Sequence, residues 1–292
     1  MSKIISTFRS ADGEAQYLAA YDVVLKQWPV PYEELHIPTR FGDTHVVASG
    51  RVGAPPVLLL HPAGGGAVIW IRNVGPLSRN FRVFAIDTIG ETNKSLLIRR
   101  IGVRQRPDFA AWMDDLLKGL QIERADLVGN SFGGFLAFST ALSLPERVRK
   151  IVLISPAATF VPITAWTLHF MPANAIGPLI GSRRLLLGAY EWIWQGFPKD
   201  ESIARLRSLA AIYGVPRHWS PGVFSDQELR SVRAPVLLLI GDHEVIYKPQ
   251  DAIRRATRLV PGIQAQIVPN ANHIAEYTAP EFVNSAILEF LA

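Results

Sequence analysis

One serine lies in a setting that favours nucleophilic chemistry. Ser131 is the middle residue of the pentapeptide Gly-Asn-Ser-Phe-Gly at 129–133, which follows a short apolar run and precedes a helical pattern. A serine between two glycines at a strand-to-helix turn occupies a sharp, strained bend that exposes its hydroxyl at the top of a sheet. The N-terminus of the following helix favours developing negative charge at the same point. The pattern therefore predicts that Ser131 is a nucleophile.

A serine hydroxyl needs a base that takes its proton, and the C-terminal part of the chain supplies candidates. Asp242 and Glu244 follow the apolar run 236–240, and His273 follows the run 265–268. Open parallel sheets bind ligands beyond the carboxyl ends of their strands. A histidine oriented by a carboxylate is the usual activator of such a serine. The order along the chain predicts His273 as the base and either Asp242 or Glu244 as the acid.

The elements that must position these residues alternate along the chain. Short apolar runs typical of strands buried on both faces occupy residues 57–60, 82–86, 125–128, 150–154, 236–240 and 265–268. Residues 108–120 place Phe109, Trp112 and Leu116 on one face of a helix. Residues 32–49 predict two antiparallel strands joined at 39–43. We therefore predict an α/β fold with a mostly parallel sheet and helices on both faces.

The alternation stops at about residue 156 and resumes at about residue 234. We predict a core formed by residues 1–155 and 234–292, with a helical insertion at 156–233. Residues 155–182 contain no Asp, Glu, Lys or Arg, but four prolines argue against a membrane-spanning helix. The aromatic residues of this insertion either form its core or line an apolar cavity. Trp166, His169 and Phe160 are the candidates for contact with a substrate.

Composition excludes several other classes of function. The chain has 292 residues and no cysteine, which excludes disulfides, thiol catalysis and thiolate metal sites. The histidines lack metal-ligand spacing, so we expect no metal and no cofactor. The net charge of +5 comes from scattered basic residues, which indicates solvated helix faces rather than a nucleic-acid surface. The first residues contain no continuous apolar segment, and we expect a cytoplasmic protein without stable membrane insertion.

Four motifs carry a resemblance to a known family. They are HPAGGG at 61–66, GNSFGG at 129–134, GDHEVIY at 241–247 and NANH at 270–273. Together they resemble an α/β-hydrolase over almost the whole chain, and the finer pattern is similar to a bacterial carboxylesterase-like group of serine hydrolases. The segment 156–233 then corresponds to the helical cap of that family.

The resemblance implies a role for each site residue. Ser131 would be the nucleophile, His273 the general base and Glu244 the acid that orients it, with Asp242 less favoured. The oxyanion hole would use the backbone N–H groups of Phe132 and Ala63. This chain departs from the usual His-Gly pair of the family, because Pro62 follows His61. We interpret His61 as a structural hydrogen-bonding residue below this loop.

The leading functional hypothesis is hydrolysis of a carboxylic ester of an apolar small molecule through an acyl-enzyme on Ser131. Two alternatives stay open. The motifs GNSFGG and HPAGGG, together with Asn73, also resemble those of hydrolases that cleave carbon–carbon bonds in vinylogous diketones. Such enzymes usually hold an arginine and an aromatic residue near the catalytic centre. The second alternative is a binding protein that retained the fold without its activity. The sequence does not determine the oligomeric state.

Overall fold

A single sheet organises the molecule. The structure is a computed structural model that describes residues 3–102, 105–180, 182–195, 200–218 and 221–292. Its described strands are β1 (Tyr32–Thr39), β2 (Gly42–Ser49), β3 (Pro56–Leu60), β4 (Arg82–Ile86), β5 (Leu96–Leu97), β6 (Ala125–Asn130), β7 (Val148–Ile154), β8 (Val236–Gly241) and β9 (Gln264–Val268). They are ordered β1-β2-β4-β3-β6-β7-β8-β9, with β5 paired to β2. The pairs from β4 to β9 are parallel, whereas β1–β2 and β2–β4 are antiparallel.

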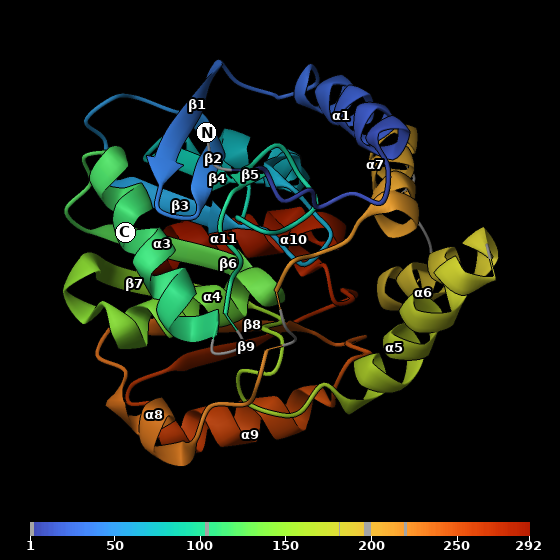
Figure 1. The fold of residues 1–292 in the computed structure, drawn as a ribbon. Helices are drawn as coiled ribbons and strands as arrows, with labels where there is room; N and C mark the ends of the chain where they lie inside the picture. Colours follow the sequence, from blue (N-terminus) through green and yellow to red (C-terminus); the bar gives the residue numbers. More distant parts are fainter. Residues whose placement is uncertain (1–2, 103–104, 181, 196–199, 219–220) are drawn as a thin grey trace.

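Helices surround this sheet (Figure 1). They are α1 (Ala11–Leu25), η1 (Ala67–Arg72), α2 (Val74–Leu77), α3 (Gln105–Gly119), α4 (Phe132–Ser143), η2 (Pro145–Arg147), α5 (Thr164–Leu179), α6 (Arg183–Trp194), α7 (Glu201–Tyr213), α8 (Asp226–Ser231), α9 (Pro249–Leu259), α10 (Ala275–Thr278) and α11 (Pro280–Leu291). The six predicted strands, the antiparallel pair and the helix near 108–120 are confirmed. Helix α1, which begins at the N-cap Ser10 and packs against α7, was not predicted from the sequence.

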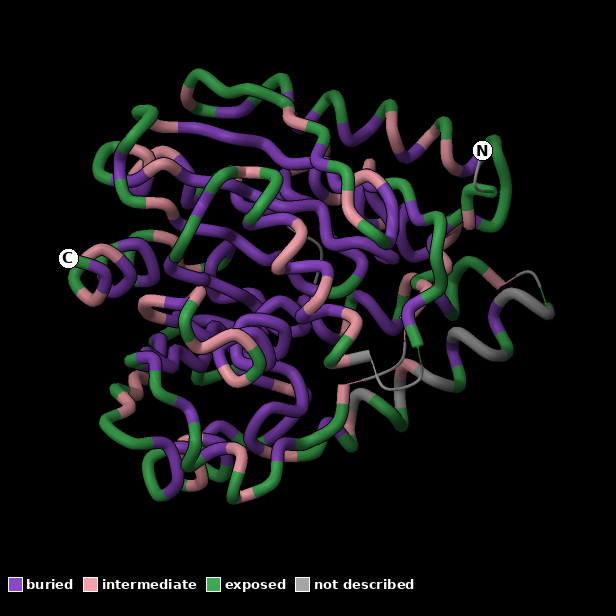
Figure 2. Tube along the Cα trace, turned by 60° about the vertical axis from the view of Figure 1, so that its left-hand side comes forward, coloured by how far each residue is buried: buried purple, intermediate pink, exposed green. Residues whose placement is uncertain are grey.

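The side chains along each strand point alternately to the two faces of the sheet and so form two separate apolar cores. On β3, Leu58 and Leu60 belong to one core, and Val57 and Leu59 belong to the other. Side chains of successive strand residues point to opposite faces, so a continuous apolar run supplies both cores. The first core also contains residues of α3, α4 and α9, and the second contains residues of α1, η1 and α11. Buried residues therefore follow the strands, while exposed ones lie mainly on loops and outer helix turns (Figure 2).

The segment predicted as a cap contains α5, α6, α7 and α8. Figure 1 shows α5, α6 and α7 grouped beside the sheet, and α7 lies next to α1. The ends of the segment instead pack on the core, because the Arg255 guanidinium of α9 donates hydrogen bonds to the carbonyls of Phe160 and Phe224. The domain boundaries at 156 and 233 remain a prediction.

Although α5 continues through Pro172, none of the helices in the described ranges is long and apolar enough to cross a bilayer.

Candidate active site

The turn between β6 and α4 holds Ser131 in an unusual backbone conformation. Its φ is 51° and its ψ is −113°, outside the regions that L-residues favour. Neighbouring chain segments approach so closely that a Cβ at Gly129 would lie 2.2 Å from the Gly133 carbonyl oxygen. A Cβ at Gly133 would lie 2.0 Å from the Leu60 carbonyl oxygen. Strain of this kind costs about 1–3 kcal/mol and persists only where the surrounding structure enforces it.

The structure brings Ser131, His273 and Glu244 into one hydrogen-bonded chain. His273 Nε2 lies 2.8 Å from Ser131 Oγ, and His273 Nδ1 lies 2.7 Å from Glu244 Oε2. All three residues are buried. Since the carboxylate accepts from Nδ1–H, Nε2 is left to accept from the serine hydroxyl. This arrangement allows His273 to remove the proton of Ser131 during attack.

Backbone and side-chain contacts hold the histidine and the glutamate in place. Glu244 Oε1 accepts a hydrogen bond of 2.9 Å from the Ile246 N–H. The Asn130 side-chain amide donates to the His273 carbonyl at 3.0 Å, which ties the residue before the serine to the histidine loop. The glutamate and the histidine are therefore each held by a neighbour outside the hydrogen-bonded chain.

The structure separates the two candidate acids. Asp242 does not contact His273 among the hydrogen bonds of the described residues, and it accepts from the N–H groups of Asn270 and Ala271, each at 3.0 Å. These backbone donors hold the pKa of the Asp242 carboxyl below its usual range. Asp242 thus stabilises the loop that leads to His273, while Glu244 contacts the imidazole itself.

The two N–H groups expected in an oxyanion hole border the same space as Ser131. Phe132 is the first residue of α4, so its N–H has no partner within the helix. Ala63 lies in the loop after β3 and lines the cavity with Phe132. Within the described part of the chain, no hydrogen bond occupies either N–H. Both donors are thus free to bind a substrate oxygen.

His61 supports the Ala63 loop from below. Its Nδ1 lies 2.8 Å from the Pro62 carbonyl, and its Nε2 accepts from the Thr88 N–H at 3.0 Å. With Nδ1–H as donor and Nε2 as acceptor, the buried ring satisfies both nitrogens. This geometry matches the structural role that we expected for His61.

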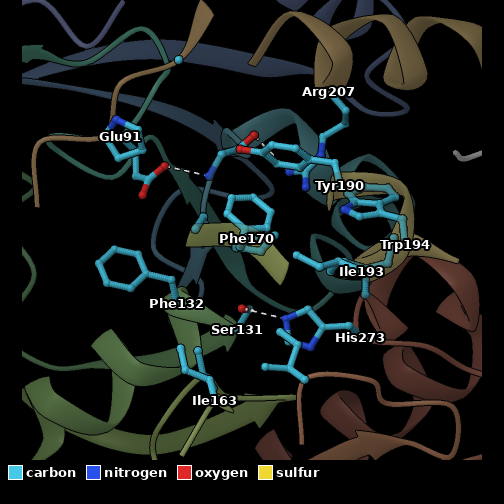
Figure 3. Close-up of a pocket in the computed structure, with 18 of the residues that line it drawn as sticks. Glu91, Ser131, Phe132, Ile163, Phe170, Tyr190, Ile193, Trp194, Arg207 and His273 are labelled. Carbon is cyan, nitrogen blue, oxygen red and sulfur yellow. Dashed lines mark hydrogen bonds between the residues drawn. The ribbon is translucent and has the colours of Figure 1, made fainter. Parts of the chain in front are cut away.

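A cavity of about 390 Å³ opens above Ser131 and His273. Apolar side chains from α4, α5, α6 and the adjoining loops form much of its wall (Figure 3). They are Phe132, Ile163, Phe170, Ile193, Trp194 and Ile274. Such a volume and lining are typical of small-molecule pockets. Glu91, Tyr190 and Arg207 lie at the end opposite Ser131 in Figure 3.

The three predictions of residues that contact substrate do not all have the same outcome. The side chains of Trp166 and His169 lie outside the described part of the structure. The expectation for Phe160 is wrong, because its ring is 1% exposed and packs edge-on against Phe138 in the core. Phe160 follows β7 closely in the chain, and this part of the segment still belongs to the packing of the sheet.

The polar residues of the cavity were not predicted from the sequence. Glu91, Arg207 and His218 all line it, although 127 residues separate Glu91 from its hydrogen-bond partner His218. Arg207 is buried on α7, and its guanidinium stacks 4.2 Å from the Trp194 ring centroid. No local pattern indicates such contacts, because the sequence of α7 has the pattern of an ordinary amphipathic helix.

In the described chain no group of three or more His, Asp or Glu is arranged to hold a metal ion, and the expected absence of a metal stays a prediction.

Glu276 on α10 is a buried carboxyl close to this site. It is fully buried, and within the described chain neither side-chain oxygen has a hydrogen-bond partner. Burial raises its pKa to about 8, although the positive charge of Arg207 opposes the shift. The folded protein therefore keeps Glu276 protonated at neutral pH.

Glu276 should make folding stability depend on pH. The folded-state pKa lies above the ordinary value of 4.5, so the contribution of Glu276 to stability is fully present below about pH 4.5 and declines as the pH rises to about 8. For Glu276→Gln we expect this component, about 1.4 kcal/mol per pH unit, to disappear. Urea unfolding at several pH values between 5 and 8 measures it. Glu281→Gln, at an exposed position of α11, should keep the wild-type slope, and equal slopes in all three proteins would contradict the assignment.

Comparison with known families agrees with the fold. Residues 57–286 match the alpha/beta hydrolase family. The chain belongs to this family, and the predicted α/β-hydrolase fold is confirmed.

The nearer relatives indicate the kind of hydrolase. The chain is 37% identical to carboxylesterase YbfK of Bacillus subtilis, over 97% of this chain and 96% of that protein. The crystal structure of naproxen esterase (carboxylesterase NP) from Bacillus subtilis superposes with a TM-score of 0.88 at 33% identity, over 97% of this chain and all of that one. The protein is accordingly an ester hydrolase of the carboxylesterase type, as the sequence predicted.

The relatives that cleave carbon–carbon bonds are more distant. The 2-hydroxy-6-oxo-2,4-heptadienoate hydrolase of Pseudomonas putida is 28% identical over 86% of this chain and 92% of that protein. The alternative hypothesis therefore has weaker support than ester hydrolysis.

Proposed function

We propose that the protein hydrolyses carboxylic esters of apolar small molecules through an acyl-enzyme on Ser131. The observation that carries the proposal is the hydrogen-bonded chain from Ser131 through His273 to Glu244 at the floor of a largely apolar cavity. The carboxylesterase relatives support the type of bond that is cleaved.

The first half-reaction forms the acyl-enzyme. Ser131 Oγ attacks the ester carbonyl carbon while His273 Nε2 takes its proton, and the carbonyl oxygen becomes an oxyanion. The N–H groups of Phe132 and Ala63 donate to this oxygen, and Glu244 stabilises the imidazolium. When the intermediate collapses, the C–O bond to the alcohol breaks and His273 returns the proton to the leaving oxygen.

The second half-reaction releases the acid. Water enters the site of the departed alcohol and loses a proton to His273 Nε2 as it attacks the acyl carbon. The same two N–H groups bind the second oxyanion. Collapse breaks the bond to Ser131 Oγ, which regains its proton from His273, and the carboxylic acid leaves. The enzyme returns to its starting state without a cofactor.

The cavity wall favours an apolar acyl or alcohol group. Burying a charged group against Ile163, Ile193 and Ile274 would cost several kcal/mol, because these side chains offer it no partner and the Arg207 guanidinium already donates to the Gly64 carbonyl. One structurally similar protein is named a naproxen esterase. We propose aromatic and aliphatic monoesters as the substrate class.

A panel of esters tests this function. We expect kcat/KM for p-nitrophenyl hexanoate and a methyl 2-arylpropanoate to exceed that for a p-nitrophenyl ester with a free carboxylate on its acyl chain by about tenfold or more. A ring-cleavage dienone is the comparison substrate. Preference for the charged ester would contradict the apolar class, and turnover of the dienone alone would favour carbon–carbon cleavage. Tight ligand binding with no turnover would favour a non-catalytic binding protein.

The setting of the protein in the cell is part of the same proposal. A cysteine-free chain fits a reducing compartment, and we propose a cytoplasmic enzyme that acts on small molecules. Its scattered positive charge supports no role in nucleic-acid binding.

A further inference from the structure

The loop that carries Ala63 is held at each of its peptide groups. The Pro62 carbonyl accepts hydrogen bonds from His61 Nδ1 at 2.8 Å and from the Gly65 N–H at 3.0 Å. A trans peptide is planar, and its C=O and N–H point in opposite directions. The Ala63 N–H, in the same peptide group as the Pro62 carbonyl, is thus directed away from His61 and Gly65.

Gly64, the next residue, is held from two sides. Its N–H donates to Glu91 Oε2 at 2.7 Å, which the dashed line at Glu91 in Figure 3 marks. Its carbonyl accepts from Arg207 Nη1 at 3.0 Å. Gly64 has a φ of +65°, a conformation that the two side chains stabilise. Rotation of the Ala63–Gly64 peptide would break the Glu91 bond, so this carboxylate opposes any reorientation of Ala63.

Glu91 is itself oriented by His218. It follows β4 and is fully buried, and its second oxygen, Oε1, is hydrogen-bonded to His218 Nε2. Burial by itself would raise the pKa of Glu91, but the neighbouring His218 and the Gly64 N–H hold it below its usual range. The Arg217 N–H donates to the Gly90 carbonyl at 2.8 Å and joins the two backbone segments next to this pair.

The same histidine contacts the residue that bears the other oxyanion donor. The His218 ring stacks on Phe132 with 4.2 Å between centroids and 7° between planes. One carboxylate–imidazole pair therefore reaches the Ala63 loop through Gly64 and reaches the start of α4 through the Phe132 ring. The catalytic chain does not use this pair, since His273 already serves Ser131.

We propose that Glu91, oriented by His218, is a positioning residue that fixes the two N–H donors of the oxyanion hole relative to each other. The inference rests on the proposed function, because it requires Phe132 and Ala63 to bind the oxyanion. Glu91 itself does not touch the reacting atoms. Its effect should appear in the transition state and leave ground-state binding of the ester largely unchanged.

Steady-state kinetics and a transition-state analogue test the proposal. For Glu91→Ala we expect kcat on p-nitrophenyl hexanoate to fall by about ten- to a hundredfold, with KM within about twofold. The Ki of an aryl trifluoromethyl ketone, which forms a tetrahedral oxyanion with serine, should rise by the same factor as kcat/KM falls. Glu91→Gln should restore most of the activity, because its amide oxygen can accept the Gly64 N–H.

Two further variants make the result interpretable. His218→Phe keeps a ring against Phe132 but removes the hydrogen bond to Glu91, and we expect a smaller loss of kcat than in Glu91→Ala. If Glu91→Ala does not fold, His218→Phe provides the test of the positioning role in its place. His36→Gln removes a surface imidazole that lies 2.7 Å from Asp43 and should leave all constants unchanged.

Failure of the inference differs from failure of the function. If the wild type hydrolyses the ester but folded Glu91→Ala keeps its kcat, the positioning role is overturned and the function stands. The role is also overturned if kcat falls while the ketone binds as tightly as before. If the wild type neither hydrolyses the esters nor binds the ketone, the proposed function fails first, and the inference fails with it.

Discussion

Ser131→Ala is expected to lower kcat for p-nitrophenyl ester hydrolysis by at least about a thousandfold. Alanine removes the oxygen that forms the acyl-enzyme, and the remaining rate comes only from water attack in the same pocket. Labelling with a fluorophosphonate probe, followed by mass spectrometry of the modified peptide, measures the nucleophile directly. The wild type should carry one adduct at Ser131, and the variant should carry none.

A serine on α4, the helix that Ser131 precedes, provides the control. Ser139 is buried on α4 and has no place in the hydrogen-bonded chain. Ser139→Ala should retain both the adduct and a kcat close to that of the wild type. Wild-type turnover by Ser131→Ala, once contamination has been excluded, would remove Ser131 from the mechanism. An adduct on another residue would do the same.

The second large effect concerns the two acids. Glu244→Gln should lower kcat by about a thousandfold or more, because a neutral amide neither stabilises the imidazolium nor enforces the Nδ1–H tautomer. Asp242→Asn should change kcat by less than about tenfold, since this side chain contacts the backbone of the loop before His273 and the exposed His243 ring, and no hydrogen bond of the described residues joins it to His273. Its effect should appear as a lower urea midpoint of unfolding.

The comparison depends on measuring both variants in the same way. Kinetics across pH 6 to 9 together with urea unfolding separate loss of catalysis from loss of fold. A large loss of kcat in Asp242→Asn with near-normal activity in Glu244→Gln would reverse the assignment. Equal losses in both, with unchanged stability, would contradict the separation of roles.

The strands and the position of Ser131 could be predicted because their signals are local. A run such as residues 236–240 is apolar at every position, and a short run of this kind is typical of a strand whose two faces are both buried. Gly129 and Gly133 flank Ser131 because the chain approaches itself too closely there for a Cβ. His273 followed from its place beyond a strand end.

Other features depend on contacts between distant segments. Asp242 and Glu244 are two residues apart in an irregular turn, so no periodicity shows which one points at His273. Phe160 was expected in the cavity, but packing against Phe138 places it in the core. The sequence alone therefore determined the fold class, the order of the nucleophile, the candidate acids and the base along the chain, and the candidates Ser131 and His273, all of which depend on short-range pattern. The resemblance favoured Glu244 over Asp242, but only the tertiary structure places Glu244 against the imidazole and brings Glu91 to His218, because those contacts depend on how separate elements pack.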